Sequence, residues 1–89
     1  MRIVFMGGLR KEFGTPIEIT LEKPIKLRDL AKILSEKVPK ITDLIDQTRG
    51  VKPGYLLFIN GTDYSLMGGL DAVIDNDDVI HVVPVNHGG

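Results

Sequence analysis

One segment of the chain, residues 27–38, carries its apolar side chains at helical spacing, and Pro39 follows it directly. This spacing predicts a single amphipathic helix, which ends there because proline cannot donate an interior backbone hydrogen bond. A chain of 89 residues has room for one hydrophobic core. With one main helix available, the other side of that core has to be a sheet. The apolar positions of the helix are Leu27, Leu30, Ala31, Leu34 and Val38.

The N-terminal region alternates apolar and polar side chains, as strands do. Residues 2–9 predict a first strand, residues 10–15 a polar connection, and residues 17–22 a second strand. Two alternating runs joined by a short connection that contains glycine predict a β-hairpin. The inward positions of its second strand are Ile17, Ile19 and Leu21.

The region after the helix predicts a short element and two more strands. Residues 41–48 predict a short second helix with Leu44 and Ile45 on its apolar side and Gly50 as its stop. Residues 55–61 predict a strand that closes on Asn60-Gly61, a strong hairpin-turn signal, and residues 79–85 predict the last strand. The turn-rich segment between them contributes three core anchors, Leu70, Val73 and Ile74.

Together these elements predict an α+β fold, a mixed sheet of four to five strands wrapped on one main helix. The first and last strands are expected to lie side by side and parallel at the centre of the sheet. We expect one domain over residues 1–85, followed by a flexible tail over residues 86–89 that ends in Gly-Gly.

Composition and motif content argue against several functions. The net charge of −1 predicts no direct binding of nucleic acid and no attraction to membranes. The chain has no cysteine and no phosphate-binding loop, and nothing supplies the further ligands that a metal would need beside its two histidines. The acidic run at residues 75–78 lacks the glycine and glutamate of a calcium loop and predicts a solvated turn. We therefore expect a cytoplasmic protein that binds no cofactor and catalyses nothing itself.

The last two residues are the most specific functional signal. Gly88 and Gly89 have no side chains, so they can enter a narrow channel in whatever backbone conformation it requires. A terminal pair of glycines can also be incidental. The pair therefore gains weight only together with the motifs that precede it.

Those motifs resemble the ubiquitin-like β-grasp proteins, and within them the ubiquitin-related modifier family. The shared features are Pro-Gly before the third strand, Asn opening its turn, a Gly-x-Leu-Asp step, an aspartate shortly before Val79, and a closing His-Gly-Gly. The chain departs from the family pattern at Tyr64, Gly69, Pro84 and Asn86. The small subunit of molybdopterin synthase and the thiamin sulfur carrier share the fold and the tail.

The resemblance implies a chemistry for the tail. The carboxylate of Gly89 would be adenylated by a partner of the ubiquitin-activating type, which uses ATP and magnesium, while His87 and Gly88 thread into that partner. Sulfur would then give a thiocarboxylate for a sulfur-accepting enzyme such as a tRNA thiolase. The same activated tail could pass to lysine amines of target proteins, forming isopeptide bonds.

Two alternatives stay open on the sequence. The chain could be the small subunit of molybdopterin synthase, which donates sulfur while docked on the large subunit of that enzyme. It could also be a passive β-grasp interaction module, in which the two glycines have no chemical role.

The alternation of the last strand predicts where a partner docks. If Ile80 and Val82 face the core, then His81, Val83 and Val85 lie on the outer face beside the tail. Apolar residues exposed there predict a partner-binding patch. The alternative is that the neighbouring first strand, through Val4 and Met6, half-covers them.

Overall fold

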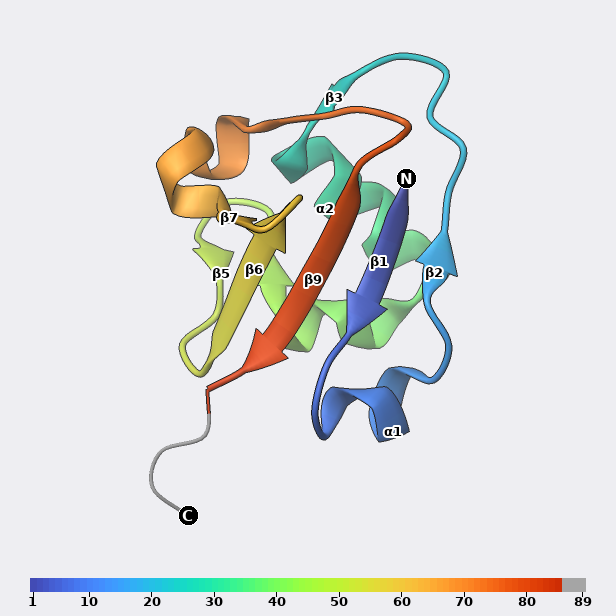
Figure 1. Ribbon diagram of the computed structural model, residues 1–89, viewed down its shortest axis with the longest axis vertical. Coiled ribbons are helices and arrows are strands. Elements are labelled where there is room, and N and C mark those ends of the chain that lie inside the picture. Colours follow the sequence, from blue (N-terminus) through green and yellow to red (C-terminus); the bar gives the residue numbers. More distant parts are fainter. Residues whose placement is uncertain (86–89) are drawn as a thin grey trace.

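The computed structural model describes residues 1–85, and in it a five-stranded mixed sheet packs against one main helix (Figure 1). The order of the strands across the sheet is β2-β1-β9-β6-β7. This arrangement confirms the predicted α+β fold. The strands are β1 (Arg2–Phe5), β2 (Ile17–Glu18), β6 (Tyr55–Ile59), β7 (Thr62–Asp63) and β9 (Val79–Pro84).

The first and last strands lie side by side and parallel, as predicted. Ile3 of β1 is in register with Ile80 of β9, and Phe5 with Val82. On its other side β9 pairs antiparallel with β6, so β9 is the central strand of the sheet. The chain therefore enters and leaves the fold through neighbouring strands.

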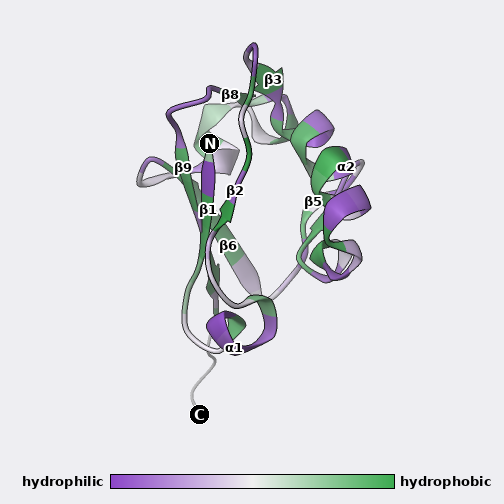
Figure 2. Ribbon diagram, turned by 90° about the vertical axis from the view of Figure 1, so that its right-hand side faces the viewer, coloured by the Kyte–Doolittle hydropathy of each residue, from purple (hydrophilic) through white to green (hydrophobic). Residues whose placement is uncertain are grey.

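The main helix, α2 (Leu27–Lys37), covers one face of the sheet (Figure 2). Its buried residues are four of the five predicted ones, and Leu30 is fully buried. Val38, the fifth, is half-buried and caps the helix by donating its N–H to the carbonyl of Leu34 at 2.7 Å. The sheet contributes the other half of the core through Ile3, Phe5, Leu57, Ile59, Ile80 and Val82.

The connection between the first two strands is helical, where we predicted a long first strand and a polar loop. β1 ends at Phe5, and α1 (Leu9–Phe13) follows. Leu9 is buried, and the ring of Phe13 stacks on that of Phe5 with 4.5 Å between centroids. A five-residue helix is too short to be stable alone, so these contacts with the core hold it in place. The predicted hairpin itself is confirmed, because β1 pairs antiparallel with β2.

The second strand is also shorter than predicted. β2 pairs with β1 through Ile17 and Glu18, and directly after it Ile19 exchanges backbone hydrogen bonds with Met1, at 3.0 and 2.9 Å. Of its three predicted inward residues, Leu21 is buried, whereas Ile17 and Ile19 are half-buried against the core.

The predicted helix over residues 41–48 is replaced by two smaller elements. Proline at the first position starts a 3₁₀ helix, η1 (Pro39–Asp43), and β4 (Ile45–Asp46) then pairs with β5 (Gly50–Val51). The burial of Leu44 and Ile45 is as predicted. The helix fails because the chain turns back after Asp46, whose carboxylate accepts backbone hydrogen bonds from Thr48 and Arg49.

The turn-rich segment supplies two of its three predicted core anchors. It contains the 3₁₀ helices η2 (Tyr64–Met67) and η3 (Gly69–Asp71), followed by β8 (Val73–Ile74), which pairs with β3 (Ile25–Lys26). Ile74 is fully buried and Leu70 packs against the core. Val73 was predicted wrongly: it is 55% exposed, because successive strand residues point to opposite faces.

The turn after β6 is the one that its sequence predicts. Asn60 and Gly61 both have positive φ angles, 49° and 85°, and they connect β6 to β7. Positive φ at both central residues is the requirement of a type I′ turn. The Asn60 side chain also ties this turn to the start of β9, because its oxygen accepts from the N–H of Val79 at 2.9 Å.

Candidate functional site on the outer face of the sheet

The face of the sheet that turns away from α2 is apolar along its three central strands. Ile80 and Val82 of β9 are buried, whereas His81 and Val83, which alternate with them, are half-buried and lie on the opposite side. The prediction that β9 faces the core through Ile80 and Val82 is therefore confirmed. We call this surface the outer face and define it as Val4, Met6, Leu56, Phe58, His81 and Val83.

His81 occupies the centre of the outer face. It is in register with Val4 on one side and with Phe58 on the other, and Val83 lies opposite Leu56. Met6 extends the β1 side of the face, because its N–H donates to the carbonyl of Val82 at 3.0 Å. An imidazole surrounded by hydrocarbon can form a directed hydrogen bond within a contact that is otherwise hydrophobic.

The first strand covers this surface only in part, as the alternative reading predicts. Val4 does lie against His81 and shares its half-buried state. Met6 and Leu56, however, are each 39% exposed, so hydrocarbon remains accessible on both sides of β9. The neighbouring strands thus enlarge the apolar surface rather than hide it.

The base of the predicted tail is held from both sides. Val85 donates its N–H to the carbonyl of Gly54 at 2.7 Å, and Pro84 pairs with Tyr55. On the other side, Gly7 has a φ of 56°, and a Cβ there would lie 3.1 Å from Cγ of Pro84. The half-buried Val85 is therefore fixed beside the outer face. The remaining predicted site residues, His87, Gly88 and Gly89, and the predicted tail boundary lie outside the described residues.

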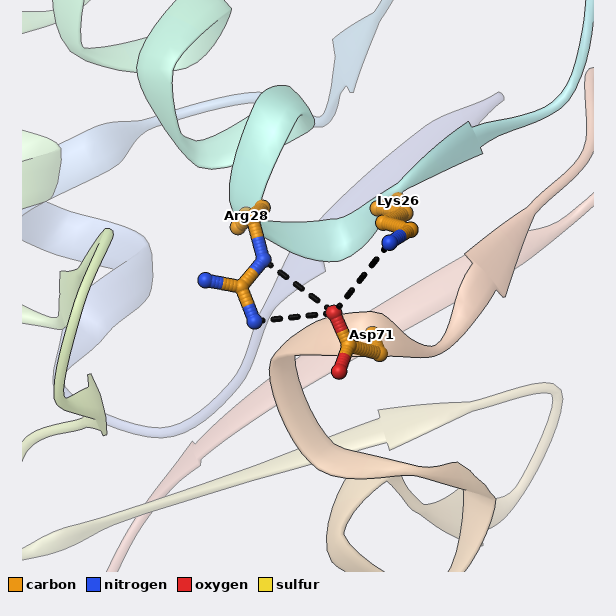
Figure 3. Close-up of polar contacts among 3 residues, drawn as sticks. All are labelled: Lys26, Arg28 and Asp71. Atoms are coloured by element: carbon orange, nitrogen blue, oxygen red, sulfur yellow. Dashed lines mark hydrogen bonds and ion pairs between the residues drawn. The ribbon is translucent and has the colours of Figure 1, made fainter.

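An exposed ion cluster joins the start of α2 to η3 at the other end of the molecule (Figure 3). The Arg28 guanidinium donates two hydrogen bonds to one oxygen of Asp71, at 2.8 and 3.2 Å, and Lys26 lies 3.6 Å from the same oxygen. Hydrogen bonding from Arg28, and then the positive charges of Arg28 and Lys26, lower the pKa of Asp71. The cluster fastens the start of α2 to η3.

Two other carboxylates whose pKa is lowered in the fold also stabilise turns. Hydrogen bonds from Thr48 lower the pKa of Asp46, and hydrogen bonds from Ser65 lower that of Asp63. In the acidic run, Asp78 accepts hydrogen bonds from the backbone of Asp75 and the amide of Asn60, both at 2.8 Å. Its two carboxylate oxygens therefore close a turn, as predicted for residues 75–78.

Within residues 1–85, no group of three histidine, cysteine or acidic side chains is placed to hold a metal ion. In the same part of the chain, none of the helices has the length and apolar character needed to cross a membrane.

Sequence reasoning placed His81 and Val83 on the outer face but missed Leu56 and Phe58. The signal was present in the run of five apolar residues at 55–59. A strand that is apolar on both faces either is buried on both or has one face left for a partner. Because one helix can cover only one face, the other face of this strand stays outside the core.

This architecture defines the class of the protein. A mixed sheet with parallel first and last strands, wrapped on one helix, is shared by its structural neighbours, which are ubiquitin-like β-grasp proteins. The family model described as Urm1 (Ubiquitin related modifier) matches residues 1–89. The chain belongs to this family of ubiquitin-like sulfur carriers and modifiers, whose members are not themselves catalytic enzymes.

Individual relatives and solved structures match the chain over most of their length. Ubiquitin-related modifier 1 of Gallus gallus is 34% identical over 95 residues, which cover 100% of this chain and 94% of the relative. The solution structure of Urm1 from Trypanosoma brucei is similar with a TM-score of 0.75 and 25% identity, covering 99% of this chain and 93% of the other. A putative molybdopterin converting factor subunit 1 from Pyrococcus furiosus shares the fold, with a TM-score of 0.71 and 19% identity over 96% of this chain and 95% of that one.

Proposed function

We propose that the protein carries sulfur on the carboxylate of Gly89, which a partner enzyme of the ubiquitin-activating type first adenylates with ATP and magnesium. The observation that carries this proposal is the match to the Urm1 family over residues 1–89, which includes the terminal His-Gly-Gly. Members of this group act with activating enzymes and sulfur-accepting partners in general.

The chemistry follows from the poor reactivity of a carboxylate. An oxygen of the Gly89 carboxylate attacks the α-phosphate of ATP and expels pyrophosphate, which gives an acyl-adenylate. Hydrosulfide from the sulfur donor then attacks the carbonyl carbon, AMP leaves, and loss of the proton on sulfur gives the thiocarboxylate. The resulting thiocarboxylate delivers its sulfur to an accepting enzyme, for which we propose a tRNA thiolase. Attack by a lysine amine on the activated carbonyl would instead give an isopeptide bond.

The outer face and the base of the tail have complementary roles in this proposal. Met6, Leu56 and Val83 offer hydrocarbon that an activating enzyme can cover. The backbone at Pro84 and Val85 is held in place, because Gly54 accepts the N–H of Val85 and Gly7 approaches the ring of Pro84. Docking on the outer face would therefore aim His87 and Gly88 into the channel of the partner.

The test is the mass of the protein after incubation with its adenylating enzyme, ATP, magnesium and a sulfur donor. The parent should exchange one oxygen for one sulfur on its C-terminal peptide. Deleting Gly89 withdraws the carboxylate by about 3.3–3.6 Å of extended chain and should abolish the exchange. The matched variant Gly89→Ala keeps the reach and should retain part of the activity. Acquisition of sulfur at the end of the shortened chain would contradict the proposal.

A further inference from the structure

Charge is distributed unevenly along β9, although the net charge of the protein is only −1. The strand begins directly after Asp77 and Asp78, in the acidic turn, and ends at Pro84 beside α1. In Figure 1, α1 and the turn before β6 lie on either side of the end of β9. These two segments carry the exposed cations Arg10, Lys11 and Lys52. The end of the molecule from which the tail departs is therefore basic.

The contacts around Pro84 and Val85 place these cations at the base of the tail. Gly7 approaches the ring of Pro84, and its carbonyl accepts from the N–H of Arg10 at 3.1 Å, so α1 begins next to β9. Arg10 and Lys11 line a groove together with Met6 and Gly7, and Met6 also belongs to the outer face. On the other side, the Lys52 carbonyl accepts from the N–H of Tyr55, which pairs with Pro84.

Some charges of the fold stabilise it through ion pairs, whereas Arg10, Lys11 and Lys52 form none within residues 1–85. The ion pairs within residues 1–85 are Arg2–Glu18, Lys26–Asp71 and Arg28–Asp71, and none of them includes Arg10, Lys11 or Lys52. Lys40, by contrast, donates to the carbonyl of Glu12 and lies 4.8 Å from the ring centre of Phe13. Lys40 thus fastens α1 to η1. The acidic residues of α1 and η1 are Glu12 and Asp43. They are outnumbered by the cations Arg10, Lys11, Lys40 and Lys52 of these helices and the turn before β6, so positive charge is in excess.

We propose that Arg10, Lys11 and Lys52 form a basic rim around the base of the tail, and that carboxylates around the channel entrance of the adenylating enzyme receive it. This inference rests on the proposed function, and it adds the chemistry by which the partner recognises the chain. The four residues 86–89 span roughly 13–14 Å when extended. The rim would thus stay at the channel entrance, too far from the activated carboxylate to contact the phosphates of the nucleotide.

The rim orients the protein before hydrophobic contact is made. Complementary charge raises association rates by roughly 10- to 1000-fold, and salt removes the effect. A small protein with an acidic turn at one end and a basic rim at the other would approach an acidic entrance with the tail first. The apolar outer face then comes into contact in the correct direction.

The experiment measures the rate of partner-dependent ATP–pyrophosphate exchange at varied concentrations of the protein, at low and at high salt. Arg10→Glu combined with Lys11→Glu should lower kcat/KM by about 10- to 100-fold at low salt, and the difference should largely disappear at high salt. Because the rim does not contact the reacting groups, kcat at saturation should stay unchanged. Lys52→Glu, on a separate element, should act in the same direction and does not depend on the stability of α1.

The matched control combines Lys23→Glu with Lys32→Glu, which changes the net charge equally at exposed positions away from the rim. Its kcat/KM should remain within about twofold of the parent, since steering depends on where the charge lies. An equal loss in both double variants, or no loss in the rim variants, overturns the inference alone. Binding of the parent to tRNA that the rim variants lose would assign the rim to nucleic acid and also overturn it. A parent that supports no exchange overturns the proposed function together with the inference.

Discussion

The two faces of the central sheet are built from the same three strands, yet one face is buried in the core and the other remains partly exposed. On the inner face, Ile3, Leu57 and Val82 are almost completely buried against α2. One residue along each strand, Val4, Leu56 and Val83 lie on the outer face and remain partly accessible. A sheet covered on one side usually alternates apolar and polar residues. The outer face departs from that rule, because it carries hydrocarbon that the core does not cover.

The difference between the two faces is tested most directly by placing one charge on the inner face of β9 and, in a second variant, one charge on its outer face. Val82→Asp should abolish folding, because it buries a carboxylate with no partner, and we expect a loss of more than about 4 kcal/mol. Val83→Asp should leave the protein folded. Circular dichroism with urea titration compares the two directly. Similar stability for both variants would show that the faces are wrongly assigned.

The helix side of the core can be tested by removing hydrocarbon. Leu30→Ala should reduce the free energy of unfolding by about 2–5 kcal/mol, because the Leu30 side chain is fully buried beneath the sheet. Lys32→Ala, on the exposed side of the same helix, is the control and should change it by no more than about 0.5 kcal/mol. Chemical denaturation monitored by tyrosine fluorescence gives both values.

The docking role of the outer face predicts a defect in binding without a defect in folding. Val83→Asp should weaken association with the adenylating enzyme by about 10- to 100-fold, since it introduces a charge into an apolar contact. Gln47→Glu adds the same charge at an exposed turn and should bind like the parent. Titration calorimetry measures both, and unchanged affinity for Val83→Asp would remove the outer face from the docking surface.

The smallest expected effect concerns the ion cluster, which belongs to neither face. Because folding lowers the pKa of Asp71, this carboxylate stabilises the fold above its ordinary pKa, and the contribution disappears as the pH falls through the lowered value. Asp71→Asn should therefore be slightly less stable than the parent at neutral pH and equal to it in strong acid. Thermal melts across that pH range provide the measurement. A deficit that persists in acid would mean that the charge of Asp71 is not the cause.

The sequence alone predicts the structure correctly where the local residue pattern and the burial of the side chains agree. The helix over Leu27–Lys37 and the parity of Ile80 and Val82 follow from spacing alone, and the structure confirms both. The turn at Asn60-Gly61 follows from local backbone preference. In each of these cases, neighbouring residues along the chain supply the physical reason for the conformation.

The failures occur where distant contacts decide the structure. Phe13 and Leu9 are spaced as one helical turn, but α1 forms only because Phe5 and the core receive them. The predicted helix over residues 41–48 fails for a more local reason, because Asp46 turns the chain back and Ile45 pairs with Val51. Val73 is exposed because its strand has two residues, of which Ile74 takes the inward place. For the candidate site, the alternation of the last strand predicts that His81 and Val83 lie on the outer face. The contribution of Leu56 and Phe58 from β6 cannot be predicted without knowing that α2 covers only one face of the sheet.

The parallel pairing of β1 with β9 also determines when a newly made chain becomes recognisable. Ile3 and Ile80 are partners that lie 77 residues apart, so the centre of the sheet cannot close until both of them have left the ribosome. The outer face draws on β1, β6 and β9 and does not exist in a chain that lacks any of them. An enzyme that reads this surface before activating the last residue would thus inspect each molecule for completed synthesis and folding.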